Sequence, residues 1–419
     1  MGKVTSLQPV LRFSGFNGDW SEKWLGNVCS IGDVDHWMPQ TVSEGIPYLM
    51  TGDFVGINEL DFANAKLISE TDYGRLSRKI KPEYGDILFA RYASVGAVRY
   101  VNTNQKFQIS YSCAILKKPR NYDSKFLFYN IQSPKFQKKV EQEINTGSQR
   151  NIGIDSLKKI EVFFPNNTVE QTKIGDFFQN LDQQIKLNQD KHNKLQQLKK
   201  AMLGKMFPKY DEEVPKVRFS GCNGKWEELK LSDIGKTYSG LAGKTKTDFG
   251  KGSKYITYVN IFRNAIIDMN LVELVNVAPE EKQNLVKYGD IFFTTSSETP
   301  EEVGMSSVLL ADITENVYLN SFCFGFRLKD LDCIAPVFMS YLLRSDDVRR
   351  LISFLAQGAT RYNLSKSQLM KITLRFPSVE EQVKIGQYFQ NLDRLIALQQ
   401  QKINKLKNIQ QACLGKMFA

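Results

Sequence analysis

Two long stretches of the chain carry side chains at the alternating four- and three-residue steps of a helical seam. In the first stretch, the apolar seam positions are Ile174, Phe178, Leu181, Ile185 and Leu195. In the second, they are Ile385, Phe389, Leu392, Ile396, Ile403 and Leu406. This spacing is typical of a coiled coil, because it returns each seam side chain to the same helix face. Since no proline lies between Thr168 and Leu203, we expect an unbroken helix roughly 50 Å long at 1.5 Å per residue.

The seam also fixes an expectation about the partner of each helix. A small domain cannot bury so amphipathic a helix alone, so the two helices are expected to pair with each other. A β-rich body separates them in the sequence, which favours an antiparallel pair. Asn188 and His192 place polar groups in the first seam, where such groups can set the register at some cost in stability. Leu187, Leu198, Leu398 and Ile409 are expected to widen the seam at its flanks.

The helices belong to a larger internal repeat. The matching segments are 9–20 with 215–226, 84–89 with 288–293, 171–182 with 382–393, and 203–207 with 414–418. Four matches in the same order, at nearly constant spacing, indicate a duplication. Residues 57–79 and 261–283 show no such match. The chain therefore joins nearly identical ends to divergent middles.

The middles are predicted to be β-rich domains. Short β-branched and aromatic runs at 87–89, 97–101 and 160–164 predict strands, and glycine, proline and asparagine separate such runs. Segments 124–145 and 335–357 are predicted to be helical. The expected fold class is α+β, with two mixed β-rich domains in tandem, each followed by a long helix. The assigned segments are 1–19 (N-terminal), 20–165 (first domain), 166–207 (first helix), 208–225 (linker), 226–377 (second domain) and 378–419 (second helix).

Composition narrows the class of protein. The chain has 419 residues, 42% hydrophobic and 24% charged, which is ordinary for a well-packed protein of more than one domain. No apolar run has membrane-spanning length, and the N-terminal segment lacks a signal-peptide core. The six cysteines show no metal-ligand spacing, so we expect reduced thiols in a cytoplasmic protein. A net charge of +11 permits nucleic-acid binding without establishing it.

The sequence carries no recognisable catalytic signature. His36 and His192 are the two histidines of the chain, which argues against histidine catalysis and a zinc site. Motifs of the HExxH, GxSxG and GxGxxG types are absent, as is the NPPY-type tetrapeptide of an amino-methyltransferase. Segment 240–245 resembles a P-loop but lacks its first glycine, so we interpret it as a basic loop. We therefore predict no catalytic residue and no metal site.

Candidate DNA contacts lie in loops after the repeated Gly-Asp-Ile motif, which we interpret as a turn into a buried strand. Arginine, tyrosine and hydroxyl side chains there can reach phosphates or bases, although an ordinary solvated loop is the alternative. The second copy differs, with Glu298, Glu301 and Glu302 after its strand. A glycine-arginine motif at 147–150 recurs at 358–361, where each arginine can neutralise a phosphate or form a surface ion pair. The candidates are Arg91, Tyr92, Ser94, Arg150, Thr294, Thr295 and Arg361.

Over essentially its whole length, the chain resembles the specificity (S) subunit of type I restriction-modification systems. The most specific element is the tail EQTKIGDFFQNLDQQI…LGKMF, repeated as EQVKIGQYFQNLDRLI…LGKMF. The RFxGxxGxW segment before each body and the GDI(L/F)F turn add to the resemblance. It implies two target-recognition domains and two spacer helices paired as an antiparallel coiled coil.

The resemblance also implies partners and cofactors. Methyltransferase (M) subunits would dock around the helices, bring S-adenosylmethionine and flip an adenine out of double-stranded DNA. Restriction (R) subunits would act as a motor using ATP and Mg. None of these cofactors is expected on this chain, which would direct methylation or restriction without being an enzyme itself.

Because the two bodies differ, the expected target is bipartite and asymmetric, with an unread gap set by helix length. An alternative is a non-catalytic coiled-coil scaffold with two adhesive domains. A scaffold predicts partner binding that is insensitive to salt, whereas phosphate contacts predict affinity that falls steeply with salt. An enzyme acting alone would need the catalytic motifs that the sequence lacks.

Overall fold

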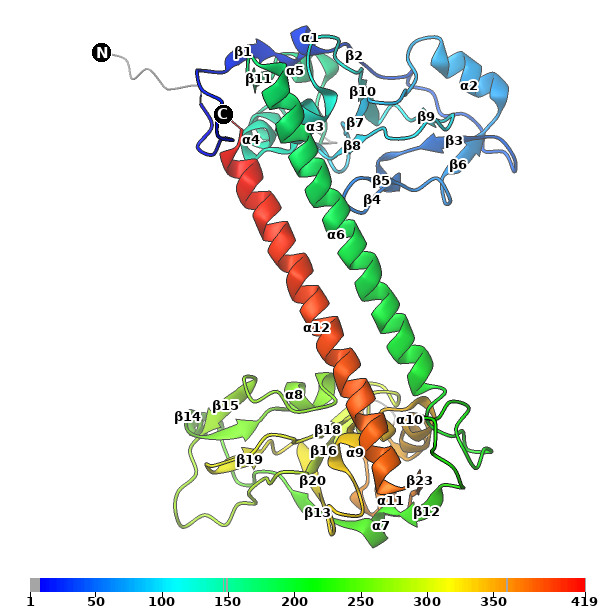
Figure 1. The fold of residues 1–419 in the computed structure, drawn as a ribbon, viewed down its shortest axis with the longest axis vertical. Coiled ribbons are helices and arrows are strands. Elements are labelled where there is room, and N and C mark those ends of the chain that lie inside the picture. The colour runs from blue at the N-terminus through cyan, green and yellow to red at the C-terminus, as the bar shows by residue number, and fades with distance from the viewer. Residues whose placement is uncertain (1–7, 146, 148–149, 359–360, 419) are drawn as a thin grey trace. The chain divides into compact units, whose positions relative to one another are not determined.

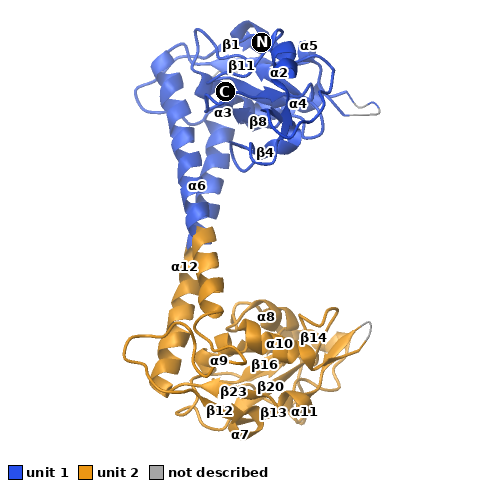
Figure 2. Cartoon of the chain, turned by 90° about the vertical axis from the view of Figure 1, so that its right-hand side faces the viewer, with its two compact units in different colours: residues 1–191, 399–419 blue, residues 192–398 orange. Residues whose placement is uncertain are grey.

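The computed structural model describes residues 8–145, 147, 150–358 and 361–418, which form two compact units (Figure 2). Unit 1 comprises residues 1–191 and 399–419, and unit 2 comprises residues 192–398. The helices α6 (Thr168–Leu203) and α12 (Val379–Lys416) are each continuous across the boundary between the units. Each unit therefore contains one body and a part of both helices. The sequence-based boundaries follow chain order instead, and they stay a prediction.

The body of unit 1 contains two main sheets (Figure 1). An antiparallel sheet has the order β2 (Ile31–Gly32), β10 (Cys113–Leu116), β7 (Ile87–Ala90), β8 (Val98–Tyr100). A mixed sheet has the order β6 (Lys66–Ile68), β3 (Ile46–Leu49), β9 (Gln108–Ile109). Two further pairs join β1 (Ser21–Trp24) to β11 (Glu161–Phe164) and β4 (Phe54–Val55) to β5 (Glu59–Leu60). The shorter helices are α1 (Leu25–Val28), η1 (Thr51–Asp53), α2 (Glu70–Ser77), α3 (Ser124–Gln132), α4 (Pro134–Gln142) and α5 (Ile154–Lys158).

Unit 2 repeats this plan with an added small sheet. Its antiparallel sheet has the order β13 (Gly235–Ser239), β20 (Cys323–Leu328), β16 (Ile291–Thr294), β18 (Ser306–Val308). Its mixed sheet has the order β15 (Val272–Val275), β14 (Phe249–Ile256), β19 (Val317–Leu319). The added sheet is β17 (Ser296–Ser297), β22 (Tyr362–Leu364), β21 (Ala356–Gln357), and β12 (Glu227–Lys230) pairs with β23 (Thr373–Phe376). The shorter helices are α7 (Leu231–Ile234), η2 (Lys246–Asp248), α8 (Tyr258–Arg263), α9 (Pro336–Leu342), α10 (Asp346–Phe354) and α11 (Lys366–Leu369).

The three strands predicted from apolar runs are present as β7, β8 and β11, and the α+β fold class is confirmed. Each of the two predicted body helices is broken into two. In unit 1 the break falls at Ser133, whose hydroxyl oxygen accepts a hydrogen bond from the backbone N–H of Phe136 at 3.3 Å. Pro134 follows as the first residue of α4, where its missing N–H costs nothing. The sequence segment therefore folds as a helical corner.

The repeated LGKMF segments close the hydrophobic core of each unit. In unit 1, the ring of Phe418 lies 5.4 Å from that of Phe126 and 5.6 Å from that of Phe178. In unit 2, the ring of Phe207 lies 5.7 Å from that of Phe338 and 5.8 Å from that of Phe389. Each core therefore depends on the short segment that follows a helix that began in the other unit.

The two long helices pair antiparallel within each unit. In unit 1, Gln410 donates a hydrogen bond to Asp182, and Gln399 donates one to Asn188 at 2.6 Å. Residue numbers thus rise along α6 as they fall along α12. In unit 2, an ion pair joins Lys199 to Asp393. The helix pairing predicted from the seam is confirmed.

Burial follows the predicted seam. Seven seam side chains are buried: Ile174, Phe178, Ile185, Ile385, Phe389, Leu392 and Ile403. Four more are half-buried: Leu181, Leu195, Ile396 and Leu406. The expectation that flanking residues widen the seam is wrong, since Leu187, Leu198, Leu398 and Ile409 are exposed. The seam is the narrow one of a two-stranded coiled coil.

Candidate nucleic-acid interface

In each unit, an ion pair joins the repeated segment before the body to the repeated helix after it. We call these joined segments the frame of the unit. Arg12 forms a bidentate ion pair with Glu170, from Nε to Oε1 at 2.7 Å and from Nη2 to Oε2 at 2.8 Å. Its third nitrogen donates to the carbonyl oxygen of Gly18 at 2.6 Å. In unit 2, Arg218 makes the same bidentate pair with Glu381, at 2.8 and 2.6 Å. Each of these carboxylates is only 1% exposed, so breaking the pair would leave a buried charge.

The repeated Gly-Asp-Ile motif is a structural turn, as interpreted from the sequence. Gly85 has a φ of 91° and Gly289 a φ of 82°, which a side chain would disfavour. The Asp86 carboxylate accepts hydrogen bonds from the backbone N–H groups of Glu83 and Lys118, both at 2.8 Å. The turn leads into a strand buried along its whole length in each unit, β7 or β16. Its role is to fix where each strand begins.

Beyond each of these strands, two distant segments meet at an equivalent place in the repeat. In unit 1, the backbone N–H of Ile152 donates to the carbonyl oxygen of Arg91 at 3.1 Å. In unit 2, the N–H of Leu364 donates to the carbonyl oxygen of Thr295 at 2.8 Å. The loop after the strand therefore lies beside the segment that follows the glycine-arginine motif. Residues 148–149 and 359–360 of those motifs lie outside the described residues.

Arg91 and Tyr92 are built into the body of unit 1. Arg91 is 5% exposed, its Nε donates to the carbonyl oxygen of Ile152 at 3.0 Å, and its Nη1 pairs with Asp33. The half-buried ring of Tyr92 lies edge-on to Tyr111, with centroids 6.3 Å apart. The buried Arg91 guanidinium thus holds the loop after β7 in place from inside the body.

Ser94 and Arg150 lie at the surface of unit 1. Ser94 is exposed, next to Ala93, which has a φ of 57°. Arg150 is exposed and forms an ion pair with Glu141, so the surface ion pair expected as its alternative role is present. An exposed pair of this kind is worth little and can open to meet a phosphate.

In unit 2, as in unit 1, some of the predicted contact residues are buried and others are exposed. Thr294 is fully buried, and its hydroxyl oxygen accepts a hydrogen bond from the N–H of Met305 at 3.0 Å. Thr295 is half-buried, and Arg361 is exposed with its Nε donating to the hydroxyl of Ser296 at 3.2 Å. Contact with DNA stays a prediction for all seven candidates, and burial gives Arg91 and Thr294 supporting positions.

Unit 2 also has a cavity that the sequence did not predict. It measures about 510 Å³ and lies between α8 and the loop after β16. Its lining residues are Tyr258, Phe262, Ser296, Ser297, Glu298, Glu302 and Arg361. The acidic loop was visible in the sequence, but nothing there indicated that α8 would face it.

Two half-buried arginines hold the walls of this cavity. Arg344 donates to the carbonyl oxygens of Ile261 at 2.8 Å and Phe262 at 3.1 Å, which fixes the end of α8. Arg349 donates to the carbonyl oxygens of residues 301, 303 and 304 at 2.6 to 2.8 Å. Burial lowers the pKa of both arginines to about 10, which leaves them charged at neutral pH. Both walls are therefore anchored to the helical corner of α9 and α10.

Unit 1 uses a neutral residue for a similar purpose. Gln137 of α4 donates to the carbonyl oxygen of Gly96 at 3.0 Å and to that of Ile131 at 2.8 Å. A Cβ on Gly96 would lie 2.4 Å from the side-chain oxygen of Gln137, so the contact requires glycine. In both units, a residue of the second corner helix sets the position of the loop.

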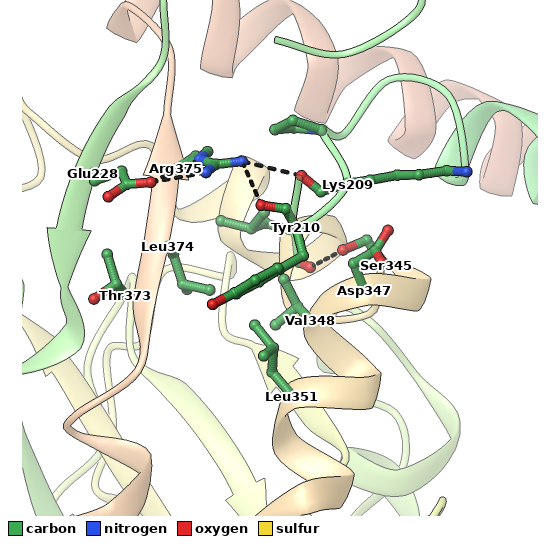
Figure 3. A pocket seen from close by; sticks show the side chains of 12 residues that line it. Lys209, Tyr210, Glu228, Ser345, Asp347, Val348, Leu351, Thr373, Leu374 and Arg375 are labelled. Carbon is green, nitrogen blue, oxygen red and sulfur yellow. Dashed lines mark hydrogen bonds and ion pairs between the residues drawn. The ribbon is translucent and has the colours of Figure 1, made fainter. Parts of the chain in front are cut away.

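A second cavity in unit 2, of about 390 Å³, seats the linker that follows α6 (Figure 3). Arg375 of β23 donates to the carbonyl oxygens of Lys209 at 3.0 Å and Tyr210 at 3.2 Å, and to the Glu228 carboxylate at 2.9 Å. Tyr210 lies over the opening and is 79% exposed. Because Arg375 and Glu228 are paired with each other and Arg375 also binds the linker backbone, we interpret this cavity as a seat for the linker.

Other chemistry considered in the sequence finds no support in the described part of the chain. The lysine of the 240–245 loop, Lys244, is paired with Glu281 at 2.6 Å. Within 8–145, 147, 150–358 and 361–418, no three histidine, cysteine or acidic side chains gather as a metal site would require. Across the same residues, no helix is both long and apolar enough to cross a membrane.

Comparison with known proteins bears directly on the two units. A family model described as the type I restriction modification DNA specificity domain matches residues 17–197 and again 223–408. The type I restriction enzyme MjaVIII specificity subunit of Methanocaldococcus jannaschii is 23% identical over 317 residues, covering 72% of this chain and 71% of that protein. A putative MjaX specificity subunit of the same organism is 23% identical over 214 residues. That match covers 50% of this chain and about half, 49%, of the relative's length.

Solved structures share the fold. The type I restriction-modification S subunit from M. genitalium superposes with a TM-score of 0.59 at 16% identity, covering 98% of this chain and 99% of that one. A chain from a study of complex assembly and conformational transition of the type I system superposes with a TM-score of 0.53 at 16% identity, covering 94% and 96%. The duplicated frame, the paired helices and the double match to one family lead to a single assignment: the chain belongs to the type I restriction-modification DNA specificity family and is a specificity subunit.

Proposed function

We propose that each unit reads one half of a bipartite, asymmetric site in double-stranded DNA. The observation that carries this proposal is the equivalent pair of segments beyond β7 and β16, with different side chains in the two units. Unit 1 presents Tyr92, Ser94 and Arg150 there, whereas unit 2 presents Glu298, Glu302 and Arg361. Because different donors and acceptors match different base edges, the two half-sites would differ in sequence.

The frame supports the proposal that each unit reads one half-site. The clamps Arg12–Glu170 and Arg218–Glu381 and the helix ends are alike in both units, while the loops are not. A common frame can present the two loop sets in the same way to a duplex, which is itself nearly two-fold symmetric in its backbone. The net charge of +11 favours the phosphate contacts that position such a protein.

We propose that the partners are methyltransferase (M) and restriction (R) subunits of a type I complex in the cytoplasm. The six cysteines, all free in this structure, suit a reducing compartment. In this arrangement the M subunits supply S-adenosylmethionine and methylate adenine, and the R subunits supply ATP- and Mg-dependent restriction. The specificity subunit contributes the choice of site.

The length of α6 and α12 is proposed to set the unread gap between the half-sites. Both helices run without a break, over 36 and 38 residues, and no proline interrupts them. Deletion of one heptad within residues 183–196, with a matched deletion in α12, is expected to shorten the gap in the methylated motif. Unchanged spacing in the motif of a folded, active variant would contradict this proposal.

The proposed function is tested by sequencing DNA methylation in cells with and without the gene. We expect one bipartite adenine-methylation motif to disappear when the gene is deleted and to return with a plasmid copy. Purified complex is expected to bind that motif with an affinity that falls steeply between 50 and 200 mM salt. If no motif depends on the gene in a strain that expresses all subunits, the proposed function is wrong.

A further inference from the structure

We propose that the cavity beside α8 in unit 2 reads a C·G base pair, with carboxylates accepting from cytosine N4 and Arg361 donating to guanine. The inference rests on the proposed function and deepens it, since it names a base pair in the second half-site. A C·G pair presents in the major groove an amino donor beside the O6 and N7 acceptors of guanine. Carboxylates accept from the first group, and arginine donates to the other two.

Side chains of opposite charge line this cavity. The Arg361 guanidinium donates to the hydroxyl of Ser296, and the Glu302 carboxylate accepts from the hydroxyl of Ser297, each at 3.2 Å. Among the described residues, neither Glu298 nor Glu302 forms an ion pair with Arg361, although all three line the cavity. Guanidinium donors and carboxylate acceptors therefore remain for a ligand that carries both kinds of partner group.

The backbone that carries these groups is held in place before any ligand arrives. Arg349 binds three carbonyl oxygens of the loop that carries Glu302, and Gly304 in that loop has a φ of 63°. The backbone of Ser296 and Ser297 pairs with β22, directly after Arg361. Side chains on a fixed loop lose less entropy when they bind. This favours discrimination between base pairs over non-specific attraction to DNA.

Two aromatic rings form one wall of the cavity. The rings of Tyr258 and Phe262 stack at 6.0 Å and 15°, and both line the cavity. Tyr258 is fixed by a hydrogen bond from its hydroxyl to the carbonyl oxygen of Ser296 at 2.9 Å. A flat apolar wall beside hydrogen-bonding groups suits the edge and face of a base better than a bare phosphate. A simple anion site would also not place two carboxylates at its rim.

Unit 1 lacks this combination at the equivalent place. Its loop carries Tyr92, Ala93, Ser94 and Val95, none of which is acidic. The nearby aromatic contacts are those of Tyr111 with Tyr92 and with His36, whose ring lies 4.9 Å from that of Tyr111. The inference therefore concerns the second half-site alone.

The test uses the full chain with its M subunits and a DNA library randomised across the recognised site. For the wild type, we expect one position read by unit 2 to require C·G. Glu302→Gln, alone and with Glu298→Gln, is expected to lower discrimination at that position by about 5- to 150-fold, the range for one good base contact. Arg361→Gln should weaken the preference at the same position, and the first half-site should keep its sequence.

The matched control is Glu315→Gln, because this exposed carboxylate pairs with Lys254 instead of lining the cavity. It should leave every position unchanged. If the wild type has a bipartite motif but the carboxylate variants leave the second half-site unchanged, the inference is wrong. It is equally wrong if these variants relax a position that requires A·T. If the wild type shows no motif at all, the proposed function fails instead, so the two failures are distinct.

Discussion

Gln399 of α12 donates a hydrogen bond to the side-chain oxygen of Asn188 of α6, at 2.6 Å, inside the helix seam of unit 1. The same nitrogen lies 3.1 Å from the backbone oxygen of Asn188. Asn188 is 5% exposed and Gln399 is 8% exposed, so water does not readily replace either partner. A polar pair among apolar neighbours stabilises one register over the others.

This pair predicts a distinctive pattern of stability. Asn188→Leu leaves the buried amide of Gln399 without its side-chain acceptor and should lower the free energy of unfolding by about 1–3 kcal/mol. The double variant with Gln399→Leu removes both polar groups and should recover most of that loss. Urea unfolding of the two single variants and the double variant measures the coupling. Additive losses would show that the pair does not contribute as described.

Acid should weaken unit 1 through Asp33. Burial acts to raise the pKa of this carboxyl, but the hydrogen bond from Lys79 and the charge of Arg91 outweigh it, and the pKa lies below its usual value. A lowered pKa in the folded state means that the stabilisation is present above about pH 4 and is lost as pH falls through the folded pKa. Asp33→Asn should be less stable than wild type at pH 7, and the difference should shrink below about pH 4. A difference that is constant between pH 7 and pH 3 would exclude this linkage.

The last residues of the chain should be essential to the first unit. Phe418→Ala removes a ring that is 5% exposed and packs on Phe126 and Phe178, so it should cost about 3–5 kcal/mol. Phe207→Ala is the matched change in unit 2. Hydrogen exchange should show protection lost in unit 1 for the first variant and in unit 2 for the second. Equal loss in both units for both variants would contradict the division of the cores.

Arg349 is expected to act as a positioning residue for the second half-site. Arg349→Met leaves the carbonyl oxygens of residues 301, 303 and 304 without these donors and should cost about 2–4 kcal/mol. The ratio of specific to non-specific DNA affinity should fall, while non-specific affinity stays the same. Gln137→Met should affect the first half-site instead. A uniform drop in affinity for every DNA would indicate a structural defect and contradict the positioning role.

The helices and the repeat were predictable from sequence because both depend on local spacing. Each of the two seams follows a period that its own segment displays, and the burial of seven seam side chains agrees with it. The turn at Gly85 and Gly289 was also readable, since glycine and aspartate have few other uses at such a place.

The sites depend on contacts between distant segments, which the sequence does not display. Arg91 looked like a surface arginine, but its carboxylate partner Asp33 lies 58 residues earlier, in a segment with no distinguishing motif. The role of Arg349 was hidden for the same reason, because its partners are backbone oxygens 45 to 48 residues away. The cavity beside α8 lies in the divergent part, where comparison of the two copies gives no guidance.

Each long helix begins in one unit and ends in the other, and this has a consequence for synthesis on the ribosome. Unit 2 is one continuous segment, residues 192–398, and it can fold as soon as that segment has emerged. Unit 1 starts earlier in the chain but needs residues 399–419, so its rings at Phe126 and Phe178 stay uncovered by Phe418 until that segment has been made. Of the two units, unit 1 is therefore started before unit 2 but completed after it, and it waits with exposed apolar surface while unit 2 forms.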